Sequence, residues 1–305
     1  MRQHPQFWPT LALLAAAAAW GLFWIPLRAF EEAGLAAGWA TVAQFVVPAA
    51  VLAPIALWRR SRGLPSGIAR FSSAFCLGLS FALYADSLLL TEVARTLILF
   101  YVTPAWSTIL EIVFMGRRLT AVRALAVTLG LAGLYVILGG HGGLPLPRNG
   151  GDWMALASGI LWAIGTLRVR QTGEQASNFE NVFGFFFYGA IAALLLTLLP
   201  LPGLGELPST ARFVAFLPWL LLVAVGFLIP VMFGLLWGSR QVDPGRVGIL
   251  LQMEAVCGIL SAAWLTSEPF GWVEAGGTVL VISAALVEVL GNRWRLDRPP
   301  ALPAA

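Results

Sequence analysis

Glu254 is the carboxylate that lies deepest within an apolar run of the sequence, residues 247–265. Burying an ionisable group in such a run is costly in a membrane, so these groups usually face other helices or a cavity and have a function. Gly258 and Ser261 follow Glu254 at helical spacing, and Gln252 lies nearby. The pattern predicts a polar binding centre, and a structural acid bonded to a neighbouring helix is the alternative.

A second polar stripe lies within residues 97–115, which carry one full charge. Spacings of four, three, four and three residues predict one shared helix face for Leu97, Tyr101, Pro104, Thr108 and Glu111. A proline within a span frees a carbonyl group, and lipid offers hydroxyl and carboxyl groups no partners. We expect this face to meet other helices or a cavity, although the position of Glu111 near a span end also fits structural ion pairing.

Aromatic residues are frequent near both stripes, and they offer stacking surfaces to an apolar substrate that carries a charged group. The candidates for cavity lining are Trp20, Phe23, Trp24, Tyr84, Tyr101 and Trp162. Packing between helices is the alternative for each. If the substrate is a zwitterion, Glu254 would face its ammonium group, and Arg28 or Arg95 would meet its carboxylate at the outer mouth. Asp86 fits either a gate or a solvated position.

The sequence contains no pattern for a nucleotide-binding loop, a zinc protease helix or a cysteine–histidine metal cluster. It has no lysine, two cysteines within apolar runs, and two histidines, His4 and His141, in predicted loops. We therefore expect no catalytic residues, no cofactor, no metal site and no binding to nucleic acid. The expected partners are a lipid bilayer and a small-molecule substrate.

The composition excludes a soluble domain, because 59% of the 305 residues are hydrophobic, 11% are charged and the mean hydropathy is +0.82. Ten apolar segments predict ten transmembrane helices. They are approximately residues 11–27, 38–57, 71–90, 97–115, 122–138, 153–167, 181–198, 213–236, 247–265 and 271–290.

The arginines predict the orientation of these segments. With the N-terminus in the cytoplasm, fifteen of the nineteen arginines fall on the cytoplasmic side and four, Arg28, Arg95, Arg148 and Arg212, on the other. This bias follows the positive-inside rule. It predicts a multi-pass protein of the cytoplasmic (inner) membrane with both termini in the cytoplasm.

The chain also resembles itself. Trp20-Gly21 matches Trp162-Ala163, and residues 92–95 match residues 243–246. Five segments per half is an odd number, so the halves must have opposite orientations. We predict an all-α protein of two inverted five-helix repeats, residues 1–140 and 141–305, in which one chain forms a complete pathway and works as a monomer.

These features resemble the drug/metabolite transporter superfamily, of the EamA type. The resemblance rests on the aromatic signature at residues 20–23, on residues 94–104, on glycines in segments five and ten such as Gly130 and Gly276, and on residues 265–268 before segment ten. Arg117 departs from the family, which often has an acidic residue there. The aromatic content looks most similar to the YddG-like branch.

The resemblance implies a secondary transporter, not an enzyme, that exports amino acids, including aromatic ones, by alternating access. A drug or nucleotide-sugar carrier of the same superfamily is one alternative, and a membrane-embedded lipid-modifying enzyme is another. A single carboxylate near the midplane favours facilitated diffusion over proton coupling.

Overall fold

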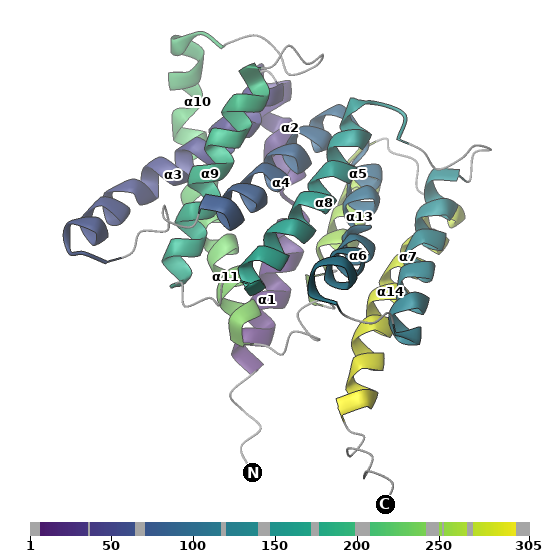
Figure 1. The fold of residues 1–305 in the computed structure, drawn as a ribbon. Helices are drawn as coiled ribbons and strands as arrows, with labels where there is room; N and C mark the ends of the chain where they lie inside the picture. The colour runs from purple at the N-terminus through teal and green to yellow at the C-terminus, as the bar shows by residue number, and fades with distance from the viewer. Residues whose placement is uncertain are drawn as a thin grey trace, which may run out of the picture.

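The computed structural model describes residues 7–35, 37–64, 71–116, 120–139, 147–171, 177–198, 208–241, 250–251, 253–266 and 271–296. Every regular element in these ranges is a helix, and no strand occurs in them. The all-α fold class is therefore confirmed. Figure 1 shows α7 and α14 side by side at one edge of the bundle, with α3 and α9 on the opposite side.

Each apolar segment of the first half contains one helix or two. The elements are α1 (Phe7–Trp20), α2 (Trp24–Glu32), α3 (Ala37–Ser61), α4 (Phe71–Leu90), α5 (Val93–Phe100), α6 (Thr103–Met115) and α7 (Ala121–Gly139).

The second half follows the same rule. Its described elements are α8 (Gly150–Gln171), α9 (Asn178–Leu198), α10 (Thr210–Val223), the π-helical turn η1 (Ala224–Leu228), α11 (Ile229–Gln241), α13 (Met253–Leu265) and α14 (Trp272–Leu296).

Six helical stretches in the described residues are long and apolar enough to cross a membrane, and three apolar helices are shorter. The protein is thus a polytopic membrane protein, and the number of ten spans stays a prediction.

The stripe predicted within residues 97–115 is not a single helix face, because the chain turns at Tyr101 and Val102 between α5 and α6. Pro104 explains the break. A proline has no N–H to bond the carbonyl group four residues back, here that of Phe100. The hydroxyl group of Thr103 donates to that carbonyl instead. Pro104 then sits in the first turn of α6, where no N–H is needed.

One further segment breaks before a proline, and another contains a π-helical turn within a continuous helical stretch. The chain turns at residues 21–23 before α2, which has Pro26 in its first turn. The π-helical turn η1 precedes α11, which has Pro230 in its first turn. By contrast, Pro48, Pro54 and Pro218 lie within continuous helices. Helix breaks of this kind are typical of transporters, where they lie next to binding sites.

Helices from residues 1–140 pack against helices from residues 141–305 at several places. Helix α4 packs against α8 and α9, and α10 to α11 pack against α1 and α3. Helices α5 and α6 contact α8, α13 contacts α1, and the pairs α3–α9, α5–α13 and α7–α14 also pack together. The site described below therefore lies where elements from both halves meet.

Candidate functional site

Glu254 lies in the first turn of α13 and is 7% exposed. The hydroxyl group of Tyr84, on α4, donates to Oε1 of Glu254 at 2.9 Å. The hydroxyl group of Tyr101 lies 3.2 Å from Oε2 and 3.1 Å from the carbonyl oxygen of Leu251, and can donate to either. Tyr101 follows α5 directly, so the break in segment four places it beside the carboxylate. We call Glu254, Tyr84 and Tyr101 the carboxylate centre.

The turn between α1 and α2 covers α13 next to this centre. Gly21 lies so close to α13 that a Cβ atom built on it would be 2.4 Å from the carbonyl oxygen of Glu254. Nε1 of Trp24 donates to Oγ of Ser261 at 3.0 Å, and that hydroxyl group donates to the carbonyl group of Gly258 at 3.0 Å. The structure thus brings together Trp24 and Ser261, which the sequence nominated separately.

An aromatic cluster adjoins the carboxylate centre, and Phe81 of α4 lies in its middle. The ring of Phe81 meets those of Trp20, Tyr84 and Trp162 edge to face, with centroids 5.3, 5.7 and 5.0 Å apart. Trp20 also stacks on Phe23 at 5.0 Å. Other members are Phe100 and Phe185. The sequence interpretation missed Phe81, Phe100 and Phe185, although Phe81 precedes Tyr84 by three residues and shares its helix face.

The other nominated residues lie as follows. Thr108 is buried in α6, and Pro104 is the second residue of that helix. Gln252 lies outside the described residues. The cavity that adjoins Tyr101, between α5, α13 and α14, has a volume of about 10 Å³, room for about one water molecule. That cavity is therefore too small for any larger molecule.

A second buried acid lies on α4, on a helix face other than the one that carries Tyr84. Asp86 is fully buried, and Thr41 of α3 is the polar side chain beside it. Neither carboxylate oxygen has a hydrogen-bond partner of normal geometry, and the same holds for the Thr41 hydroxyl group and for both amide atoms of Gln44. Thr41 and Gln44 share a helix face by their spacing of three, a signal that the sequence offered and the interpretation did not use.

The outer mouth, at the ends of helices predicted to face away from the cytoplasm, contains a charged network. Both oxygens of Asp152, at the start of α8, accept hydrogen bonds from the Arg95 guanidinium group. Thr91 and the backbone N–H of Arg148 also donate to Asp152, each at 2.8 Å. Asp152 thus already binds two of the guanidinium nitrogens of Arg95, and a contact between Arg95 and a substrate carboxylate stays a prediction.

This network controls the ionisation of Asp152, which lies ahead of the apolar part of α8. Burial would raise the pKa of Asp152, but the hydrogen bonds from Arg95, from the Arg148 backbone and from Thr91 outweigh burial and hold the pKa below its ordinary value of 3.8. The network links α5 of the first half to α8 of the second. Beside it is an open pocket of about 500 Å³, which Arg28, Arg95 and Arg148 line.

The comparisons with known proteins agree with this architecture. The model of the EamA-like transporter family matches residues 7–139 and 149–290. An uncharacterized transporter of Archaeoglobus fulgidus is 26% identical over 68% of this chain and 72% of its own length. A biotin transporter of Escherichia coli K12 is 25% identical over 72% of each chain.

The fold is also found in a solved crystal structure, which has a TM-score of 0.62 and covers 95% of this chain and 98% of its own chain at 19% identity. The matching relatives are transporters, and the family model covers nearly the whole chain. The protein belongs to the EamA-like transporter family.

Proposed function

We propose that this protein is a secondary transporter that exports small zwitterionic solutes, amino acids including aromatic ones, across the inner membrane by alternating access. The observation that carries the proposal is the carboxylate centre: a buried Glu254 bonded to two tyrosines beside an aromatic cluster. A carboxylate suits the ammonium group of an amino acid, and the aromatic rings suit its side chain.

The helix ends around Glu254 favour a cation as well. Tyr101 directly follows the C-terminal end of α5 and contacts the Glu254 carboxylate, while Gly21 directly follows that of α1 and lies against the backbone carbonyl group of Glu254. A helix C-terminus carries partial negative charge, and interrupted transporter helices use such ends to bind cations. The end of α5 and the carboxylate therefore attract a positive group to the same place.

Alternating access is supported by reciprocal contacts, in which α4 packs against α8 and α9 while α10 to α11 pack against α1 and α3, and by the match of the family model in two stretches, 7–139 and 149–290. We propose that residues 1–140 and 141–305 are inverted repeats and that one chain contains a full pathway. The arginine bias supports cytoplasmic termini.

The test is flux of radiolabelled phenylalanine through the purified protein in liposomes. We expect uptake down a gradient, competition by tryptophan, and a loss of at least tenfold in Glu254→Gln, which removes the charge that binds the ammonium group. Glu32→Gln is the matched control, because Glu32 is exposed at the end of α2. Absence of phenylalanine flux in the wild type would overturn the proposal.

The second candidate class of substrate is a carboxylic acid that has no ammonium group, because four of the matching relatives are named biotin transporters. Biotin offers no cation to Glu254. The same liposomes with labelled biotin separate the two candidates: an amino-acid carrier does not transport biotin, whereas a biotin-type carrier transports it in both the wild type and Glu254→Gln.

A further inference from the structure

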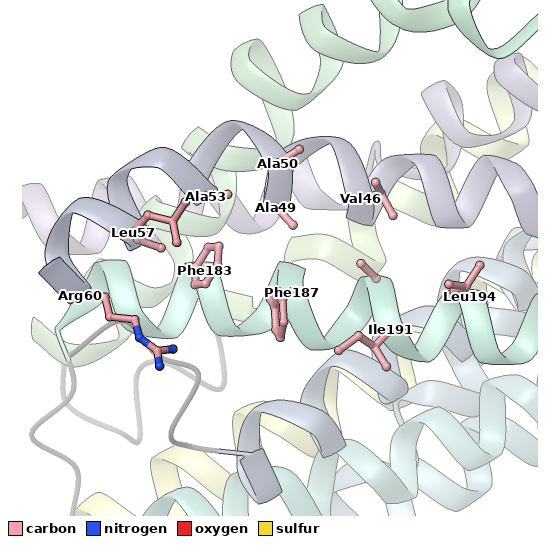
Figure 2. A pocket seen from close by; sticks show the side chains of 12 residues that line it. Val46, Ala49, Ala50, Ala53, Leu57, Arg60, Phe183, Phe187, Ile191 and Leu194 are labelled. Carbon is pink, nitrogen blue, oxygen red and sulfur yellow. The ribbon is translucent and has the colours of Figure 1, made fainter. Parts of the chain in front are cut away.

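A long apolar groove lies between α3 and α9, away from the carboxylate centre (Figure 2). Its volume is about 430 Å³. Small residues of α3, among them Ala49 and Ala53, form one wall, and larger residues of α9, among them Phe183, Phe187 and Ile191, form the other. The groove exists because alanines leave space opposite the larger side chains.

The groove is long enough to hold a hydrocarbon chain, and its lining is exposed on the surface of the protein. On α3 its lining runs from Val46 to Arg60, which at the rise of an α-helix corresponds to about 21 Å. One leaflet of a bilayer has a hydrocarbon depth of about 15 Å, half of the full core. Val46, Ile191 and Leu194 are 37%, 38% and 41% exposed, so the membrane can reach the groove along its length.

One end of the groove is charged. Arg60 is the one ionisable residue of the lining, and Figure 2 shows its guanidinium group at the end of the row of apolar side chains. Its neighbours are engaged elsewhere: Arg59 donates to Ser177, and Arg62 lies over the ring of Trp58. No hydrogen bond or ion pair joins the Arg60 side chain to any residue in the described ranges.

We propose that this groove binds one acyl chain of an anionic phospholipid, whose phosphate group pairs with Arg60. The arginine bias places the Arg60 end of α3 at the cytoplasmic surface, at the level of the headgroups. Arg59 and Arg62 on the same helix end add positive charge there. An anionic headgroup such as phosphatidylglycerol neutralises that charge, whereas phosphatidylcholine brings a cation of its own.

The lipid would lie between corresponding helices of the two halves, since α3 and α9 belong to the second and the seventh apolar segments. Lipid binding itself does not depend on which substrate the protein carries, so the test below is independent of the proposed function.

The test is native mass spectrometry of the full chain purified in detergent and supplied with equal amounts of phosphatidylglycerol and phosphatidylcholine that have identical acyl chains. We expect one phosphatidylglycerol to be retained in preference, in the wild type and in the control Arg62→Gln. In Arg60→Gln the preference should fall about fivefold, the change expected when one cationic contact at a membrane surface is lost.

A second variant tests the apolar part of the site. Ala53→Phe fills the groove and should reduce retention of both lipids, while the thermal unfolding midpoint shows whether the variant is folded. Equal retention of the two lipids by the wild type would overturn the proposal without any substitution. An unchanged preference in Arg60→Gln would overturn the pairing of the phosphate with Arg60.

Discussion

At the scale of single residues, the two buried acids of α4 and α13 differ in their partners. Glu254 has a tyrosine hydroxyl group at each oxygen, whereas both oxygens of Asp86 lack a partner of normal geometry. Buried polar groups are nearly always hydrogen-bonded, and a charge without a partner is strongly destabilising. The two acids should therefore respond to substitution in opposite ways.

Removal of either tyrosine hydroxyl group should destabilise the protein. Tyr84→Phe removes the donor to Oε1 of Glu254, and Tyr101→Phe removes the hydroxyl group beside Oε2 and the Leu251 carbonyl oxygen. A buried hydrogen bond contributes about 0.5–3 kcal/mol, depending on the charge of its partner. We expect a lower thermal unfolding midpoint in detergent and a reduced rate of phenylalanine transport. Tyr135→Phe is the control, because Tyr135 is 59% exposed on α7. Midpoints equal to that of the control would contradict the assigned hydrogen bonds.

Asp86→Asn should stabilise the protein. The amide has nearly the same shape but cannot carry a charge in the apolar surroundings of α3 and α4. The unfolding midpoint should rise, and if Asp86 takes part in transport, flux should fall at the same time, as is common where function requires a strained site. Asp152→Asn is the comparison for which the opposite result is expected. It replaces an acid that accepts four hydrogen bonds, and it should lower the midpoint. A lower midpoint in Asp86→Asn would show that Asp86 has stabilising partners.

At the scale of elements, the sequence predicted where helices occur but not where they break. Apolar content alone marks each segment, and each of the ten contains a described helix, while the number of membrane spans stays a prediction. The breaks depend on whether a neighbour satisfies the carbonyl group that a proline frees, as the Thr103 hydroxyl group does for Phe100. Local sequence does not distinguish Pro104, which follows a break, from Pro48, which lies within α3. The shared helix face predicted for segment four failed for this reason.

Gly21→Ala should separate the α1–α2 turn from α13. The added Cβ atom would lie 2.4 Å from the carbonyl oxygen of Glu254, a distance that backbone atoms cannot accommodate without movement. We expect a loss of about 1–3 kcal/mol in stability, seen as a lower unfolding midpoint, with reduced transport. Gly276→Ala is the control, because its Cβ atom would meet nothing within 4 Å. A Gly21→Ala protein with wild-type stability and flux would mean that this close approach has no role.

The network between α5 and α8 should make stability depend on pH in the acid range. The pKa of Asp152 is lower in the folded protein than its ordinary value of 3.8. Its contribution to stability is therefore complete above that ordinary value and is lost as the pH falls through the lowered folded value. Unfolding midpoints of the wild type and Asp152→Asn, measured from pH 6 downward, should converge at low pH. A constant difference over that range would contradict this linkage.

At the scale of the whole molecule, the centre joins residues that are far apart in the sequence. Tyr84 and Glu254 are separated by 170 positions and Tyr101 and Glu254 by 153. The sequence nominated all three, since an acid and tyrosines within apolar segments are unusual on their own. It could not show that they touch, because contacts between segments depend on how the two halves pack. The Thr41–Gln44 pair and Phe81 are a different case, because their spacing of three along one helix was a signal in the sequence that the interpretation did not use.

The driving force of transport depends on the number of carboxylates at the centre. The position that corresponds to Glu254 in the first half, at the offset of 151 between residues 92–95 and 243–246, is Thr103, so the centre has one carboxylate and not two. A substrate ammonium group can neutralise that carboxylate, and a cycle that uses it needs no proton. We therefore expect wild-type protein in liposomes to equilibrate phenylalanine without a pH gradient. An imposed gradient should produce no uphill accumulation, and Glu254→Gln should slow equilibration without changing its end point. Accumulation that requires both the gradient and Glu254 would establish proton coupling in place of facilitated diffusion.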